Sequence, residues 1–281
     1  GAILAKVTID ATGDGDVIAR SGAEFVQDDD LQPMTLACVI GGVDCWPKVR
    51  SQEMREKVQA AIEDGTYPIR RGPGLFPMWR KGEVYANATR ISGDCTDAWD
   101  LSRAEFEGRR QLAGMVRWLR ENVRGYENCF LMKTAPQVGL RESRLLVGVY
   151  TLTREDVMEY RQFDDAICLS AYGIDIHYKG LGGEMTWLEP GKSHGIPYRC
   201  CLPETMDGLL AAGRCISATH DAMGATRVMA TGLAIGHGAG VAAALSSKAG
   251  VRPRDVDIQQ VRETLRRQKA ILRDGRASRP G

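Results

Sequence analysis

Two short segments carry histidines in settings suited to proton transfer. In "IDIH", His177 follows Asp175 at strand spacing i, i+2, so both side chains share one face and can form an oriented acid/base pair. His220, in "SATH", is a second candidate for proton transfer. For both histidines a purely structural role is the alternative. His237, in "IGHG", lies inside a glycine-rich helical stretch, where packing is the expected role.

The segment "LRESR" holds two arginines that can bind an anion. Planar guanidinium groups pair with carboxylates through two parallel hydrogen bonds, so Arg141 and Arg144 can clamp an anionic substrate. The same arginines can instead form a structural salt-bridge cluster with Glu142 that joins two domains. The sequence leaves both roles open.

A strand predicted over residues 2–10 runs directly into the small corner Ala11-Thr12-Gly13. Ligands of open α/β folds bind at the carboxyl ends of parallel strands, and small residues let the backbone approach a ligand closely. Backbone amides from Asp14 onward would favour an anion at the same point. The alternative is an ordinary helix start with Asp14 as its N-cap.

A second glycine-rich region follows a predicted strand, "GLLAAG", that ends at Gly213-Arg214. A polar loop with His220 and Arg227 then leads into a helix predicted over 229–248. Three alternate glycines in that helix resemble a dinucleotide loop, but they do not directly follow a strand. Close packing of the helix against a sheet or a ligand explains them better.

The rest of the chain supplies the elements around these segments. An apolar stripe of Leu112, Met115, Val116 and Leu119 predicts a helix over 101–124. Thr153 with Asp156 predicts a capped helix start. A short helix is predicted at "DVIARSG", where it ends at Gly22, and further helices are predicted over 48–64 and 254–271. Strands are predicted over 34–44, 143–151 and 172–177 and at "IPYRCCLP".

Composition is that of an ordinary soluble globular protein, with 281 residues, 43% hydrophobic residues and 26% charged residues. A net charge of +1 gives no reason to expect nucleic acid or an anionic membrane as a partner. No apolar run suggests a membrane span and no signal peptide is visible. Eight cysteines without a C-x-x-C pair predict buried free thiols in a reducing, cytoplasmic setting, and no metal site.

The chain resembles the FAD-dependent oxidoreductase family of the two-dinucleotide-binding-domain flavoproteins, which is distantly similar to the flavoprotein subunits of fumarate reductase and succinate dehydrogenase. The resemblance rests on "IDATGDGDVIARSGAEF", "QPMTLACVIGGVD", "VGLRESRLLVGVYTLTREDV", "IDIH", "IPYRCCLP" and "LLAAGRCISATHDAMGATRVMATGLAIGHGAGVAAAL", in consistent order across residues 2–272. These motifs identify the family and leave the substrate open.

The resemblance implies FAD as the cofactor and assigns two groups of residues to it. The nucleotide half of FAD would lie on Ala11, Thr12, Gly13 and Asp14. The flavin ring and ribityl chain would lie against Gly213, Arg214, Arg227, Val228 and Met229. In this arrangement the start of the 229–248 helix faces the pyrimidine edge of the ring, where its partial positive charge favours the reduced flavin.

One part of the family pattern is missing, namely the strand, G-x-G-x-x-G and helix that hold the FAD pyrophosphate. Three explanations are open: the sequence is a fragment, a second polypeptide supplies the missing half, or the protein does not hold FAD. We expect a fragment, and therefore weak FAD binding by this chain alone.

The resulting expectation is an α/β FAD/NAD(P)-binding three-layer fold, incomplete at its N-terminus, with an inserted α+β substrate domain. The FAD-binding domain is predicted over 1–30 and 195–250, the substrate domain over 31–194, and a C-terminal helix and tail over 251–281. The full-length protein would transfer a hydride between FAD and a small organic substrate, with His177, Arg141 and His220 as catalytic candidates and NAD(P)H or an electron-carrier protein as a possible partner. The main alternative is a cofactor-free remnant, or a subunit that needs a partner chain. A thiol-dependent oxidoreductase is a weaker alternative, because no cysteine stands at a clear helix N-terminus.

Overall fold

The computed structural model describes residues 1–179 and 182–272, which form two compact units. The first unit comprises residues 1–29, 142–176 and the described part of 183–281; the second comprises 30–141 and the described part of 177–182. The structure therefore groups residues 142–176 and 183–194 with the first unit, whereas the sequence analysis placed them in the inserted domain. The assignment of functions to the two units stays a prediction, and the tail expected at 273–281 lies outside the described residues.

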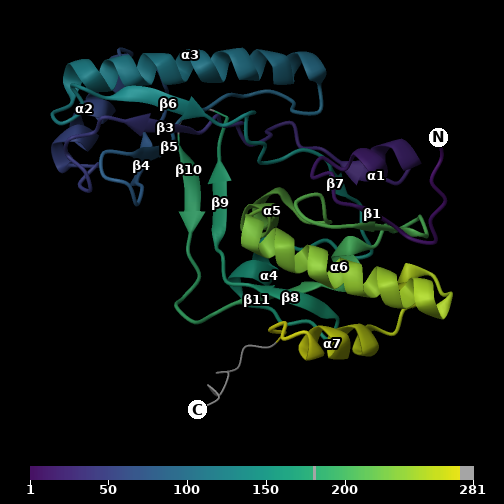
Figure 1. The fold of residues 1–281 in the computed structure, drawn as a ribbon. Helices are drawn as coiled ribbons and strands as arrows, with labels where there is room; N and C mark the ends of the chain where they lie inside the picture. Colours follow the sequence, from purple (N-terminus) through teal and green to yellow (C-terminus); the bar gives the residue numbers. More distant parts are fainter. Residues whose placement is uncertain (180–181, 273–281) are drawn as a thin grey trace. The chain divides into compact units, whose positions relative to one another are not determined.

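The first unit is organised around two short parallel strands from distant parts of the chain. Strand β1 (Thr8–Asp10) pairs with β12 (Leu209–Ala211), from Thr8 opposite Leu209 to Asp10 opposite Ala211. The predicted strand over 2–10 is thus only its last three residues. Helix α1 (Asp16–Ser21) follows β1 and ends at Gly22, as predicted, whereas α5 (His220–Thr226) and α6 (Met229–Ala249) follow β12 (Figure 1).

Antiparallel strands form the remaining layers of the first unit. Strand β8 (Ala166–Ser170) pairs with β11 (His194–Pro197), and both α6 and α7 (Ile258–Arg267) pack on β8. Two further pairs are β2 (Phe25–Val26) with β7 (Leu145–Leu146), and β9 (Ile174–His177), whose last residue belongs to the second unit, with β10 (Gly183–Thr186). The remaining elements are α4 (Arg154–Met158) and the 3-10 turns η1 (Tyr198–Cys201) and η2 (Pro253–Asp255).

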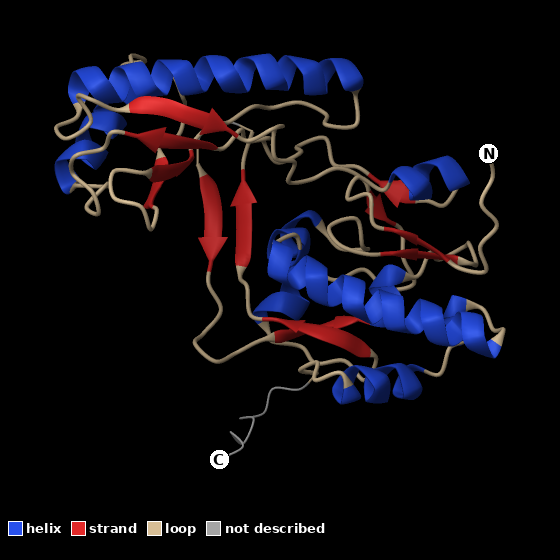
Figure 2. Cartoon of the chain, viewed as in Figure 1, coloured by secondary structure: helices blue, strands red, loops and turns tan. Residues whose placement is uncertain are grey.

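The second unit is a four-stranded antiparallel sheet with two helices. The strand order is β4 (Gly74–Pro77), β5 (Val84–Asn87), β3 (Cys38–Gly41), β6 (Phe130–Thr134). Helix α3 (Ala98–Asn122) lies along this sheet (Figure 2), and α2 (Gln52–Glu63) completes the unit. The predicted stripe on α3 is buried, which confirms it, and the helix starts at Ala98 because the carboxylate of Asp97 accepts the amides of Trp99 and Asp100.

Helix α6 confirms the helix predicted over 229–248, but it also meets a length and composition test for a membrane span that the sequence analysis expected no segment to meet. The helix has 21 residues, and an 18-residue window within it has a mean hydropathy of 1.3, so it is long and apolar enough to cross a membrane by length and composition. The apolar character comes from alanines together with Leu233, Ile235, Val241 and Leu245, and the glycines among them interrupt any long run of bulky residues. Ile235, Ala239 and Ala242 of α6 are fully buried in the core of the first unit, and 33% of the 18-residue window is buried.

Together these elements give a mixed α/β architecture. The cysteines behave as predicted, since all eight are free and seven are buried, with only Cys45 partly exposed. The prediction of a strand through "IPYRCCLP" is only partly correct. The strand ends at Pro197, which cannot donate a ladder hydrogen bond, and the chain turns into η1.

Candidate functional site

A buried carboxylate shapes the corner at the end of β1. Asp10 is fully buried, and its Oδ1 accepts hydrogen bonds from the backbone N–H of Thr12 at 3.0 Å and from the Thr12 hydroxyl at 2.7 Å. Its Oδ2 accepts the N–H of Ile18 at 2.8 Å, which ties the start of α1 to the strand. Asp10 therefore fixes the geometry of the corner, and the sequence analysis did not single it out.

The residue expected to cap α1 has another role. Gly15, with φ of +64°, occupies the N-cap position, and the hydroxyl of Thr12 accepts the N–H of Asp16 at 3.0 Å. The alternative that the sequence analysis left open, Asp14 as N-cap, is wrong for this reason. Asp14 instead accepts a hydrogen bond from the Ser143 hydroxyl at 2.7 Å and forms an ion pair with Arg214.

Gly13 and Arg214 meet where the carboxyl ends of β1 and β12 lie side by side. Gly13 has φ of +85°, and a Cβ built on it would come 2.3 Å from Nη1 of Arg214. Nε of Arg214 is buried and has no hydrogen-bond partner among the described residues, and no atom of these residues lies within 4 Å of a Cβ built on Gly213, which has φ of +91°. The two corners therefore converge although Asp14 and Arg214 are 200 residues apart in sequence.

The connection between α5 and α6 presents a second set of unused donors. Nη2 of Arg227 donates to the backbone oxygen of Asp175 at 2.8 Å and to Oδ2 of Asp175 at 3.0 Å. Nε of Arg227 is buried and has no partner in the described part of the chain. Helix α6 begins after Val228 with no side-chain cap, and Met229 is 87% exposed. The first-turn amides of a long helix are thus open to an electron-rich group.

These features fit the cofactor that the sequence motifs imply. FAD has pyrophosphate, ribose and pyrimidine oxygens, and such oxygens accept hydrogen bonds from donors of the kind that the Nε atoms of Arg214 and Arg227 offer. The bare backbone at Gly213 and the uncapped start of α6 leave room for close approach. The predicted cofactor residues Ala11 and Thr12 belong to the corner after β1, and Val228 directly precedes α6.

His220 is held by a buried carboxylate. Its Nδ1 lies 2.8 Å from Oε1 of Glu142, whose side chain is 1% exposed, and 3.9 Å from Oδ2 of Asp28. The hydrogen bond to Glu142 raises the pKa of His220 from its ordinary value, although partial burial opposes the rise. Nε2 has no hydrogen bond to a described residue, and the side chain is 23% exposed. The arrangement orients one ring nitrogen and leaves the other for proton exchange.

Sequence reasoning did not assign Glu142 a role beside a histidine, and its only signal was a lone acid between arginines. The burial that makes Glu142 effective depends on the fold around it.

The other two predicted catalytic residues lie in the second unit. Arg141 donates from Nη1 to the backbone oxygen of Pro33 and to the Thr35 hydroxyl, which are structural contacts within that unit. The backbone N–H of His177 donates to Gln32 at 3.1 Å. The carboxylate expected to pair with His177, that of Asp175, forms an ion pair with Arg227. Neither unit by itself contains all three predicted catalytic residues.

The remaining histidines differ from expectation. His237 is exposed on α6, and its Nε2 lies 2.6 Å from Oε1 of Gln268, so its predicted packing role is wrong. His194 is fully buried in β11 with no hydrogen-bond partner on either ring nitrogen. Burial lowers the pKa of His194 from 6.5 to about 4, so the ring is neutral at pH 7.

Comparison with known proteins gives one match. No curated protein and no solved structure matches the chain significantly. The model of a family described as "FAD dependent oxidoreductase" matches residues 1–265, nearly the whole chain. The cofactor that this family implies, FAD, agrees with the unused donors at the two converging corners. The chain belongs to the FAD dependent oxidoreductase family.

Proposed function

We propose that this chain forms one wall of an FAD site in an oxidoreductase that transfers a hydride between FAD and a small organic substrate. The observation that carries the proposal is the meeting of Gly13 with Arg214, which joins the two predicted cofactor segments at the carboxyl ends of β1 and β12. Open α/β folds bind their ligands at this edge.

The chain's own residues have separate tasks in this proposal. The Ala11–Gly13 corner holds the nucleotide half of FAD, and Arg214 donates from its buried Nε. The first-turn amides of α6 and Arg227 face the pyrimidine edge of the ring. FAD, when bound, supplies hydride exchange at its flavin ring.

His220 handles the proton that accompanies hydride exchange with many organic substrates. Glu142 holds Nδ1, which directs Nε2 toward the accessible side of the ring. The raised pKa of His220 keeps a larger fraction of the ring protonated near neutral pH, so His220 is suited to donate a proton to a substrate that is being reduced.

We also propose that a further segment completes the nucleotide site, either in a longer form of this protein or in a partner chain. Among the described residues β1 and β12 form a sheet of only two parallel strands, whereas parallel strands normally lie in larger, covered sheets. Built Cβ atoms on Gly232, Gly236 and Gly240 of α6 meet nothing within 4 Å, and Leu233 is 77% exposed. An additional strand and helix would cover this open edge and face.

FAD titration tests the proposed wall. Arg227→Gln should weaken FAD binding about tenfold or more, because a charge-assisted hydrogen bond is removed. Arg20→Gln is the matched control, since Arg20 is exposed on α1 and has no ion pair with a described residue. Quenching of flavin fluorescence measures both affinities in the product of the complete reading frame. Equal affinities in the two variants would remove Arg227 from the site.

The alternative function is a cofactor-free remnant or a subunit that needs its partner. The observation behind it is that no strand followed by G-x-G-x-x-G occurs among the described residues. Purified protein from the complete reading frame that is folded but colourless, and that shows no flavin binding in the titration, would support the remnant. Yellow protein with stoichiometric flavin would support the oxidoreductase.

A further inference from the structure

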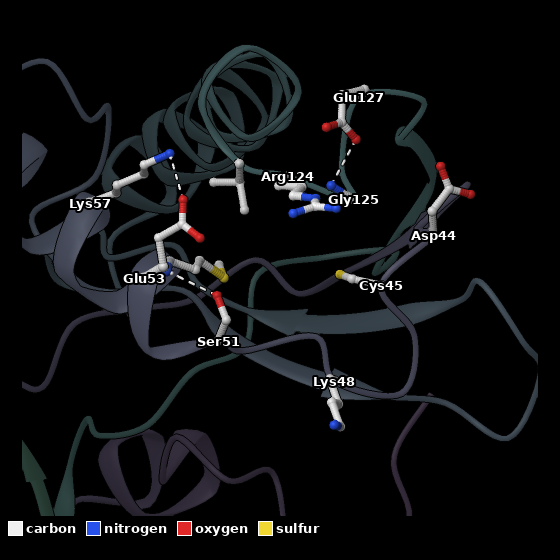
Figure 3. Close-up of a pocket in the computed structure, with 11 residues that line it drawn as sticks. Asp44, Cys45, Lys48, Ser51, Glu53, Lys57, Arg124, Gly125 and Glu127 are labelled. Atoms are coloured by element: carbon white, nitrogen blue, oxygen red, sulfur yellow. Dashed lines mark hydrogen bonds and ion pairs between the residues drawn. The ribbon is translucent and has the colours of Figure 1, made fainter.

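The second unit contains a hollow that none of the predicted site residues line. Its volume is about 580 Å³, within the range of about 300–1,000 Å³ found for small-molecule sites. The start of α2, the turn after α3 and the segment after β3 form its wall (Figure 3). The labelled side chains that matter for its chemistry are Asp44, Cys45, Lys48, Glu53, Arg124 and Glu127.

The acidic groups of the wall already have partners. These pairs are Glu53 with Lys57 at 3.0 Å, Glu127 with the N–H of Gly125 at 2.7 Å, and Asp44 with the side-chain amide of Asn128 at 3.2 Å. By contrast, Arg124 and Lys48 make no hydrogen bond or ion pair with a described residue. The three carboxylates of the wall keep their charge and are balanced by Lys48, Lys57 and Arg124, so the cations that can pair with a ligand are Arg124 and Lys48.

Arg124 is the better placed of the two cations. It lies near the middle of the labelled side chains, whereas Lys48 extends away from them (Figure 3). A planar guanidinium can hold two oxygens of one carboxylate or phosphate group. The first turn of α2, whose residues Glu53 and Met54 line the hollow, adds partial positive charge on the same wall.

We propose that this hollow binds a small organic anion whose carboxylate or phosphate oxygens pair with Arg124. Met54 and Val123 supply apolar contacts for the carbon part of such a molecule. The site is separate from the proposed FAD wall, because every residue that lines it belongs to the second unit.

Cys45 provides a reporter inside the hollow. It is the one cysteine that is not buried, and all eight cysteines lie in the described part of the chain. A Cβ built on Gly125 would come 2.6 Å from the Cβ of Cys45, so the backbone next to Arg124 packs directly on this residue. An anion held by Arg124 would therefore hinder access to the Cys45 sulfur.

Alkylation of Cys45 by iodoacetamide, a neutral reagent, tests the proposal in the whole chain. Burial and the neighbouring carboxylates Asp44 and Glu127 raise the pKa of Cys45, so a mildly alkaline buffer is used. Intact mass gives the rate at constant ionic strength with chloride, inorganic phosphate or malonate. Phosphate or malonate should slow the reaction in a saturable way, and Cys45→Ser should abolish the modification.

Arg124→Gln should weaken the protecting effect about tenfold or more, as expected for the loss of a charge-assisted hydrogen bond. Arg117→Gln is the matched control: Arg117 is also exposed, has no ion pair with a described residue, lies on α3 and does not line the hollow. Thermal unfolding verifies that both variants are folded. Protection no greater than that of chloride, or equal protection in Arg124→Gln and Arg117→Gln, would overturn the proposal. Saturable protection by either probe that is lost only in Arg124→Gln would establish it.

Discussion

Replacing Gly13 by alanine tests the contact between the β1 corner and Arg214, and Gly22 offers a matched control. Both glycines have φ of +85°. A residue with a Cβ costs about 1–2 kcal/mol in this left-handed region. A built Cβ on Gly22 meets nothing within 4 Å, so Gly22→Ala should lose about that much stability and no more.

Gly13→Ala should lose more, because its Cβ would come 2.3 Å from Nη1 of Arg214. The arginine must move away, and this movement breaks its ion pair with Asp14. The side chains of Arg214 and Asp14 are only 20% and 18% exposed. A hydrogen bond between charged groups contributes about 1.5–3 kcal/mol. The expected loss is therefore about 2.5–5 kcal/mol, against about 1–2 kcal/mol for Gly22→Ala.

Urea unfolding followed by circular dichroism measures both losses by linear extrapolation. A double-mutant cycle with Arg214→Gln isolates the contact, because the shorter side chain removes the clashing atoms. The double variant should be more stable than the sum of the single losses predicts by about 1 kcal/mol or more. Equal losses for Gly13→Ala and Gly22→Ala, or strict additivity in the cycle, would refute the reasoning.

Two further predictions concern the histidines of the first unit. Burial lowers the pKa of His194 from 6.5 to about 4, so as the pH falls His194 is protonated in the unfolded chain before it is protonated in the folded chain. The free energy of unfolding should therefore fall by about 3 kcal/mol as the pH drops from 6.5 to 4. His194→Leu should flatten this dependence in urea unfolding, and an unchanged slope would contradict the assignment. Glu142→Gln should lower the pKa of His220, because the hydrogen bond to Glu142 is the main cause of its rise, and an NMR titration of the His220 ring measures the change. Asp28→Asn, at 3.9 Å from Nδ1, should lower it less. Because the pKa of His220 is higher in the folded chain than in the unfolded chain, the pair with Glu142 stabilises the fold fully at pH values below the unfolded-state pKa near 6.5. This stabilisation is lost as the pH rises through the folded-state pKa. Glu142→Gln should therefore destabilise the protein more at pH 6 than at pH 9.

Local signals in the sequence predicted the elements that are determined locally. The stripe on α3 and the capping box of Thr153 and Asp156 both appear in the structure, because helix periodicity and capping need only neighbouring residues. Gly22 ends α1 as predicted, in the left-handed conformation that glycine adopts without strain.

Features that depend on distant parts of the chain were not predictable in this way. Asp10 organises the β1 corner only because β12 and α1 bury it, and Glu142 matters only because the fold places it against His220. Asp14 looked like a helix cap, but Arg214 and Ser143 occupy its carboxylate instead. In each case tertiary contact, which no local pattern encodes, decides the role of the side chain.

Hydrogen exchange of the backbone amides, measured with FAD, ADP or riboflavin present, tests most directly whether the two corners bind one cofactor together. The account predicts that FAD protects amides of residues 11–14 together with those of 213–214 and 227–231 in the product of the complete reading frame. ADP should protect the first segment, and riboflavin should protect the start of α6. Protection by FAD that leaves either segment unchanged would contradict the account.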